Sequence, residues 1–114
     1  MRQRISQVLG VPMEPERKSV LIEADELVHG DRSAAYGHPL DNFTRIAGMV
    51  NAMLAHKIRE PLTAEDFAYI MACAKLSRQI NMPKRDNMTD LAGYAESADW
   101  MIDERKARQN DRSV

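Results

Sequence analysis

Two pairs of carboxylates at helical spacing are the first candidates for chemistry in this 114-residue sequence. Asp86 and Asp90 are four residues apart, and Glu23 and Glu26 are three apart, so each pair is close together if its segment is helical. Carboxylates from two helices of a bundle are a common way to hold Mg²⁺ or Mn²⁺. The four residues are therefore candidate metal ligands. The alternative is a solvated helix face, on which Asp86 and Asp90 only favour the positive end of their helix.

Basic residues are available to neutralise these acids or a bound anion. Lys75 and Arg78 are three residues apart and share a helix face with apolar residues, so they place two positive charges at one end of an apolar stripe. Lys84 and Arg85 follow in the next segment. The alternative for Lys75 and Arg78 is that their stems pack on the core while their charged ends stay in water.

Polar and small residues surround the carboxylates of the last helical segment. One stripe, opposite to the apolar face, consists of Asp86, Asp90, Gly93 and Ser97. The neighbouring stripe consists of Asn87, Asp90 and Tyr94. The small side chains of Gly93 and Ser97 would let another surface approach closely.

The segment "VHGDRSAAYGHPLDNF", residues 28–43, concentrates polar and special residues in a connection between helices. His29 and His38 are nine residues apart, which is no recognised zinc spacing. Asp31 and Arg32, at the end of the first helix, could bind each other or the second helix. Tyr36 offers a flat face for stacking and a hydroxyl for hydrogen bonding, and Gly37 permits a backbone conformation that other residues avoid. The alternative for Tyr36 is packing over its own turn.

Hydrophobic periodicity predicts four helices and no strand. The first covers residues 17–30 and stops at Gly30, and the second covers residues 42–58 with Asp41 as its cap. The third begins after Thr63 in a capping-box-like sequence, and its "FAYIMACA" body is apolar on all sides, which is typical of a central, covered helix. The fourth covers residues 85–106 and is expected to bury Met88, Leu91, Ala92, Ala95, Ala98 and Ile102.

We therefore expect an all-α protein. Its architecture would be a four-helix bundle with a short N-terminal arm or helix and a disordered, charged C-terminal tail. The expected divisions are an arm at residues 1–16, a helical domain at residues 17–106 and a tail at residues 107–114.

Composition narrows the functional classes. Apolar residues make up 44% of the sequence and aromatic residues 5%, which favours helices over strands. The net charge of −1 gives no overall attraction to nucleic acid or to anionic membranes, so neither partner is indicated. With no signal peptide, no apolar run near the roughly 18 residues of a membrane span, and a single cysteine, the chain is expected to be cytoplasmic. The thiol of Cys73 is expected to be buried and inert.

Three segments carry a recognisable order of motifs. They are "IEADELVHGDRSAAYGHPLDNFTRIA", "LTAEDFAYIMACAKLSR" and "PKRDNMTDLAGYA", with the order G-D-R, Y-G-x-P, N-F, E-D, K-x-x-R and K-R-D-N-x-x-D-x-x-G-Y. Together they resemble a family of uncharacterised phage and prophage proteins, a domain of unknown function, over about residues 19–96. The resemblance implies a phage-type protein in the host cytoplasm, but no activity.

The chain also resembles the all-α nucleotide pyrophosphohydrolases of the MazG and dimeric dUTPase kind. Those enzymes are self-associating helical bundles that hold Mg²⁺ with an E-E-x-x-E motif on one helix and an E-x-x-D motif on another. Glu23 and Glu26 match the E-x-x-E part, whereas Asn87 and Asp90 give N-x-x-D. The missing carboxylate would weaken a Mg²⁺ site.

This second resemblance implies how the scattered groups would combine. Glu23, Asp86 and Asp90 would hold Mg²⁺ against a polyphosphate, the basic residues would neutralise its oxygens, and Tyr36 or Phe43 would stack on the base. A metal-activated water would attack the α-phosphate and release pyrophosphate. The expected ligand-binding residues are Arg32, Tyr36, Lys75, Arg78, Lys84, Arg85, Asn87 and Tyr94.

The sequence thus favours a phage-type protein that binds a nucleotide or another phosphorylated small molecule and forms a homo-oligomer. MazG-like, Mg-dependent hydrolysis of nucleoside triphosphates is the favoured activity, with no side chain assigned to catalysis. One alternative is a non-catalytic protein that binds a nucleotide or a nucleotide signal, as in phage counter-defence, and the N-x-x-D departure favours it. The other is a structural, oligomeric interaction protein.

Overall fold

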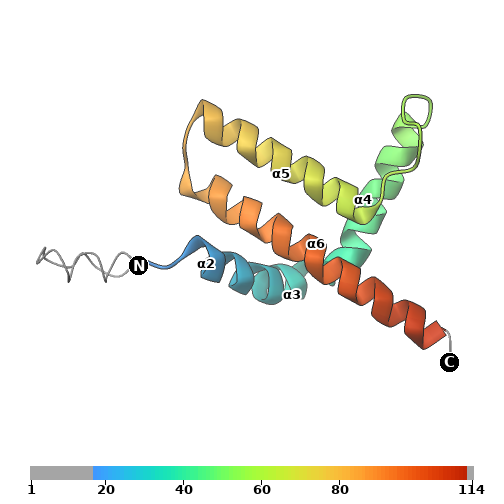
Figure 1. Cartoon of the computed structure of the whole chain (residues 1–114), viewed down its shortest axis with the longest axis horizontal. Helices are drawn as coiled ribbons and strands as arrows, with labels where there is room; N and C mark the ends of the chain where they lie inside the picture. Colours follow the sequence, from blue (N-terminus) through green and yellow to red (C-terminus); the bar gives the residue numbers. More distant parts are fainter. Residues whose placement is uncertain (1–16, 113–114) are drawn as a thin grey trace, which may run out of the picture.

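The structure, a computed structural model, describes residues 17–112, and its regular elements in that range are all helical (Figure 1). The elements are α2 (Val20–Glu26), the π-helix η1 (Leu27–Asp31), α3 (Arg32–Tyr36), α4 (Pro39–Leu54), α5 (Ala64–Asn81) and α6 (Arg85–Arg112). Because α2, η1 and α3 follow one another without a break, they form one helical run. The predicted all-α, four-helix class is confirmed, while the predicted arm at residues 1–16 lies outside the described residues.

The first helical run begins as a capped helix and ends later than predicted. The Ser19 hydroxyl accepts a hydrogen bond from the Leu21 N–H at 3.1 Å, which satisfies one of the free N–H groups of the first turn. Gly30 was expected to stop the helix, but it lies inside η1 and the run continues to Tyr36. The chain turns at Gly37, whose φ of 76° lies in a region that L side chains rarely adopt.

Helix α4 is capped by a histidine, so the prediction that Asp41 caps it is wrong. The Nδ1 atom of His38 accepts a hydrogen bond from the Leu40 N–H at 3.0 Å, and Pro39 occupies the first helical position, where a missing N–H costs nothing. Asp41 lies within the first turn and its carboxylate instead binds Arg108 at 2.7 Å. The helix ends at Leu54 rather than near residue 58.

Helix α5 begins as the sequence predicts. The Thr63 hydroxyl accepts from the Asp66 N–H at 3.1 Å and the Asp66 carboxylate accepts from the Thr63 N–H at 3.0 Å, which is a complete capping box. Asn51 holds the preceding loop to α4 through two hydrogen bonds with the backbone of Leu62, at 3.0 and 2.8 Å. The start of α5 is therefore fixed by both local and longer-range contacts.

Helix α5 runs antiparallel to α6, while α2 and the following η1 lie along the first half of α6, below it in the view of Figure 1. Helix α4 crosses near the start of α5 and leads away from α6. The core lies where α4, α5 and α6 meet. It consists of Leu40, Phe43, Ala64, Ala68, Ala98 and the fully buried Met101, with Phe67 and Tyr94 packed against it.

Helix α5 is less covered than its apolar sequence predicts. Its buried residues are Ala64, Glu65 and Ala68, all near its start, whereas Cys73 is exposed. The expectations of a central helix and of a buried thiol are therefore wrong within the described residues. The physical reason is that α5 contacts α6 and α4, and among residues 17–112 no other helix packs against its remaining side.

Helix α6 buries only part of the face that was predicted to be buried. Ala98 is buried as predicted and Met88, Leu91 and Ala92 are half-buried, whereas Ala95 and Ile102 are exposed. The other buried residues are Asn87, Thr89, Gly93, Ser97 and Met101, so the small residues of the polar stripe face inward. A Cβ placed on Gly93 would lie 3.6 Å from a methyl of Val28, which shows how closely the first helical run packs there. The helix also continues past residue 106 to Arg112, and its Arg108 binds Asp41 and Glu104.

Candidate functional site

A cavity of about 380 Å³ lies between the first helical run, α4, α5 and α6. This volume is in the usual range for sites that bind small molecules. Its lining residues are Val28, Arg32, Ser33, Tyr36, Gly37, Pro39, Asn42, Phe43, Lys75, Asp90, Tyr94 and Ser97. Since each helical unit contributes to the wall, the fold itself determines the shape of this cavity.

One carboxylate and two cations form the charged part of the cavity wall. Asp90 accepts from Lys75 Nζ at 2.8 Å and from Arg32 Nη2 at 3.1 Å. Burial by itself would raise the pKa of Asp90, but the hydrogen bonds and charges of Lys75 and Arg32 outweigh burial and hold that pKa below its usual value. Asp90 is therefore ionised at neutral pH, and the group of three carries one net positive charge.

The rest of the wall combines aromatic rings with small polar groups. Tyr36 lies at the cavity and is 64% exposed, so its ring is accessible to a ligand. The rings of Phe43 and Tyr94 have centroids 6.1 Å apart, and both residues line the cavity while also contacting the core. Asn42 and Ser97 add a side-chain amide and a hydroxyl. The cavity thus offers cations, flat apolar surfaces and neutral hydrogen-bonding groups.

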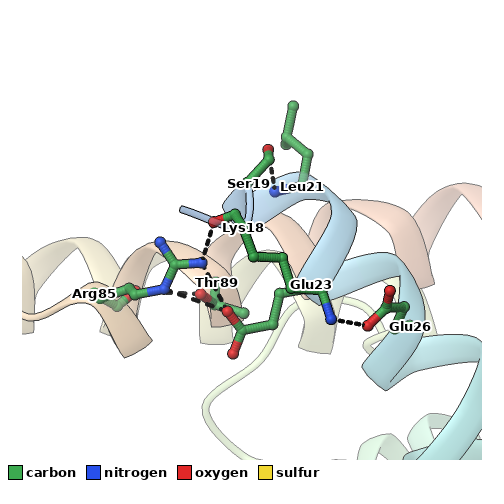
Figure 2. A network of polar contacts seen from close by, with 7 residues as sticks. All are labelled: Lys18, Ser19, Leu21, Glu23, Glu26, Arg85 and Thr89. Carbon is green, nitrogen blue, oxygen red and sulfur yellow. Dashed lines mark hydrogen bonds and ion pairs between the residues drawn. The ribbon is translucent and has the colours of Figure 1, made fainter. Parts of the chain in front are cut away.

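Three of the four predicted metal ligands, Glu23, Glu26 and Asp90, each form an ion pair with a different cationic side chain. Figure 2 shows Glu23 accepting from Nε and Nη2 of Arg85, at 3.3 and 2.8 Å, beside a contact between Lys18 and Glu26. Arg85 Nη2 also donates to the Lys18 carbonyl at 2.7 Å.

The other two predicted metal ligands are Asp90, which binds the cavity cations, and Asp86, which is exposed. Among residues 17–112, no three of these four carboxylates have oxygens within 4.8 Å of one another. The binding of Mg²⁺ or Mn²⁺ stays a prediction.

Half of the predicted ligand-binding residues line the cavity. Arg32, Tyr36, Lys75 and Tyr94 do, whereas Arg78, Lys84, Arg85 and Asn87 do not. Arg78 and Lys84 are exposed, and the Asn87 amide donates to Gln79 at 3.1 Å. Sequence reasoning missed Ser33, Asn42 and Ser97 as cavity residues. Asn42 stands in the N-F motif, which was a usable signal, while nothing in the sequence distinguishes Ser33 from the serines elsewhere.

A second polar cluster lies where η1 meets α6. His29 Nε2 is 2.8 Å from a Glu96 oxygen and 3.7 Å from an Asp25 oxygen, and these three ligand atoms all lie within 4.8 Å of one another. The Trp100 ring contacts His29 and also His38, with centroids 4.1 and 4.2 Å apart. Despite their spacing in the sequence, the two histidines therefore contact one tryptophan, which links the first helical run and the start of α4 to α6.

Two further ion pairs hold α6 against the other helices. The guanidinium of Arg105 binds both carboxylate oxygens of Glu65, one of them at 2.7 Å, and Arg108 binds Asp41 at 2.7 and 3.0 Å. Both are two-point contacts, a geometry that fixes orientation as well as distance. They brace α6 against the starts of α5 and α4, close to the core.

None of the helices in residues 17–112 has the length and hydropathy to cross a bilayer. A family model described as a domain of unknown function (DUF6378) matches residues 19–101.

Among curated proteins, the Gene 55 protein of Mycobacterium phage D29 is 36% identical over 88 residues, which are 76% of this chain and 56% of that protein. The Gene 55 protein of Mycobacterium phage L5 is 36% identical over 78 residues, which are 68% of this chain and 48% of that protein. The chain thus spans about half the length of these relatives. No solved structure matches it.

Proposed function

The chain belongs to the DUF6378 family of domains of unknown function and is similar to two mycobacteriophage proteins, and we propose that it binds a nucleotide or a related phosphorylated small molecule. The proposed site is the cavity lined by Arg32, Lys75 and Asp90. The observation that carries the proposal is that two cations converge on one carboxylate in the wall of a cavity of ligand size. The proposed location is the host cytoplasm, where nucleotides are available.

The charged group supports an anionic ligand. Among the described residues, Lys75 and Arg32 each donate one hydrogen bond to Asp90. An ammonium group has three donors and a guanidinium has five. The remaining donors can bind phosphate oxygens without breaking the contacts to Asp90. Because Lys75 is 13% exposed, a phosphate there would be partly removed from water, where charge-assisted hydrogen bonds are stronger.

The aromatic residues support the nucleotide class. A nucleotide presents a flat base as well as its phosphate, and the Tyr36 ring is accessible at the same cavity as the two cations. Base stacking on an aromatic side chain is worth about 1–3 kcal/mol and tolerates different bases. Asn42 and Ser97 could add hydrogen bonds to a sugar or a base. A small inorganic anion would use the cations and leave these groups without a partner.

The pairing of the carboxylates favours binding without hydrolysis over MazG-like pyrophosphohydrolysis. Hydrolysis of that kind requires Mg²⁺ or Mn²⁺ on several carboxylates, and in the described residues Glu23, Glu26 and Asp90 each contact a cationic side chain instead. A metal would have to displace Arg85, Lys18 or Lys75. We therefore propose that the chain binds its ligand without hydrolysing it.

Calorimetric titration of the purified chain with nucleoside mono-, di- and triphosphates, with and without Mg²⁺, tests this function. We expect a nucleotide to bind without metal and Lys75→Ala to weaken its binding at least tenfold. Arg78→Ala is the matched control, because Arg78 is a cation one turn away on α5 that does not line the cavity, and it should bind as the wild type does.

The same samples are assayed for pyrophosphate with Mg²⁺ and with Mn²⁺. Release of pyrophosphate that is lost in Asp90→Asn would replace our proposal with the enzymatic one. No heat of binding with any nucleotide, or equal weakening by Lys75→Ala and Arg78→Ala, would contradict the proposed site and leave the interaction-protein alternative.

A further inference from the structure

Helix α5 exposes an apolar stripe on the side that α4 and α6 leave uncovered. Tyr69 is 53% exposed, Leu76 46% and Ile80 86%, and Cys73 between them is also exposed. Their spacings of four, three and four residues align them along one side of the helix. This is the spacing of the a and d positions of a coiled coil, at which one helix packs along another.

We propose that this stripe is the seam of a homodimer, in which α5 of one copy packs against α5 of a second copy. The residues that flank the seam are Ile70, Ala72, Ser77 and Gln79, and none of them is charged. Two identical faces can therefore meet without the like-charge repulsion that flanking acids or bases would produce. Twofold dimers with a self-complementary patch are the commonest oligomers, which suits such a face.

The charges at the two ends of α5 favour an antiparallel pair. Asp66 lies in its first turn and contributes a negative charge there, whereas Glu65 is buried and paired with Arg105; Arg78 lies in the last turn and Lys84 follows it. An antiparallel partner brings the acidic end of one helix toward the basic end of the other, and it also opposes the two helix dipoles. A twofold axis midway along the stripe then places Tyr69 opposite Ile80 of the second copy, and Cys73 opposite its Leu76.

The core of a single chain is small, which indicates that a partner covers the exposed side of α5. Helix α5 buries Ala64, Glu65 and Ala68, so most of its large apolar side chains remain in water in a single chain. Two such stripes, with Ile70 and Met82 beside them, would bury on the order of 1,000 Å², which is about the lower limit for a specific interface. A second copy would make α5 the covered, central helix that its sequence predicts.

Sedimentation equilibrium of the full chain tests the seam, and it does not depend on the proposed ligand. We expect a dimer for the wild type. Leu76→Asp and Ile80→Asp should each weaken the dimer at least tenfold while far-ultraviolet circular dichroism stays unchanged, because both side chains are exposed in the single chain. Met53→Asp is the matched control, since Met53 is 72% exposed on α4, outside the stripe.

Disulfide crosslinking tests the antiparallel register. A disulfide needs two Cα atoms within about 7 Å, so Leu76→Cys should crosslink rapidly to Cys73 of the second copy, while Leu76→Cys with Cys73→Ser should not crosslink. A wild type that is monomeric at every concentration, or a dimer that Leu76→Asp leaves intact, overturns the seam. Efficient Cys73 crosslinking in the wild type indicates parallel helices and overturns the register.

Discussion

The ammonium of Lys75 on α5 lies 2.8 Å from the carboxylate of Asp90 on α6, in the wall of the cavity. Asp90 also accepts from Arg32, so this one carboxylate connects the first helical run, α5 and α6. The same contact therefore serves the packing of three helical units and the orientation of the two cations that we assign to ligand binding.

Asp90→Asn should lower the free energy of unfolding by about 1–2 kcal/mol at pH 7, because two cations lose their shared anionic partner. Urea unfolding measures this loss. Asp86→Asn is the control, one turn away on the same helix, where the described residues show no ion pair, and it should change stability by less than about 0.5 kcal/mol.

The stabilisation by Asp90 also has a pH dependence. Because its folded-state pKa is lowered, the contribution is complete above the unfolded pKa of about 3.9 and is lost as the pH falls through the folded value. The difference in stability between wild type and Asp90→Asn should therefore shrink only in acid, below about pH 4. A difference that vanishes already near pH 6 would show that another group is responsible.

Gly37→Ala should destabilise the chain by about 1–2 kcal/mol, because φ at Gly37 is 76° and a Cβ is strained there whatever the free space around it. Gly48→Ala provides the opposite control. Gly48 lies inside α4 with nothing within 4 Å of its added Cβ, so alanine should raise the free energy of unfolding by about 0.5–1 kcal/mol. Thermal and urea unfolding measure the sign of the stability change for each variant. Equal changes in Gly37→Ala and Gly48→Ala would contradict the left-handed turn at Gly37.

The features that depend on residues close together in the sequence were predicted correctly from the sequence. The capping box of Thr63 and Asp66 is contained in four residues, and the helix class follows from periodicity and composition, so both were predictable. The prediction that the first helix ends at Gly30 was wrong because a glycine is compatible with a helix as well as with a turn. Only the backbone at Gly37, which the sequence cannot show, distinguishes the two glycines.

Contacts between distant segments were less predictable. The small residues of α6 face inward because Val28 packs close to Gly93, and a stripe of small and polar residues reads as exposed until that neighbour is known. Arg32 and Lys75 were predicted to bind a ligand; both line the cavity, and their binding of a ligand stays a prediction. Arg78 and Lys84 are just as conspicuous in the sequence, but Arg78 lies on an exposed side of α5 and Lys84 lies in the loop between α5 and α6, so neither lines the cavity.

The His38 cap should make stability fall in mildly acidic solution. Its Nδ1 must be unprotonated to accept from the Leu40 N–H, and burial, partly opposed by Glu104, lowers the pKa of His38 below its usual value. The cap therefore contributes fully above the unfolded pKa of about 6.5, and its contribution is lost as the pH falls through the lowered folded value. His38→Asn keeps an N-cap acceptor without this titration. Its stability relative to wild type should rise between about pH 6.5 and pH 5 in urea unfolding, and a constant difference would contradict the cap.

Arg105→Met should be among the more destabilising changes at the surface of α6. Glu65 is 7% exposed and binds Arg105 through both carboxylate oxygens, so the substitution leaves a buried carboxylate without its cation. We expect a loss of about 2 kcal/mol in the free energy of unfolding, below the value for a fully buried pair because the Arg105 side chain is 38% exposed.

The double variant Glu65→Leu with Arg105→Met distinguishes the stability that the ion pair contributes from the cost of leaving the buried Glu65 carboxylate without a cation. Apolar replacements of a buried pair are often tolerated, so the double variant should recover most of the loss caused by Arg105→Met alone. Arg108→Met is the control, because Arg108 binds the exposed Asp41 and exposed ion pairs contribute little. A double variant less stable than Arg105→Met would show that the pair itself, rather than the relief of an unpaired buried carboxylate, stabilises the junction of α5 and α6.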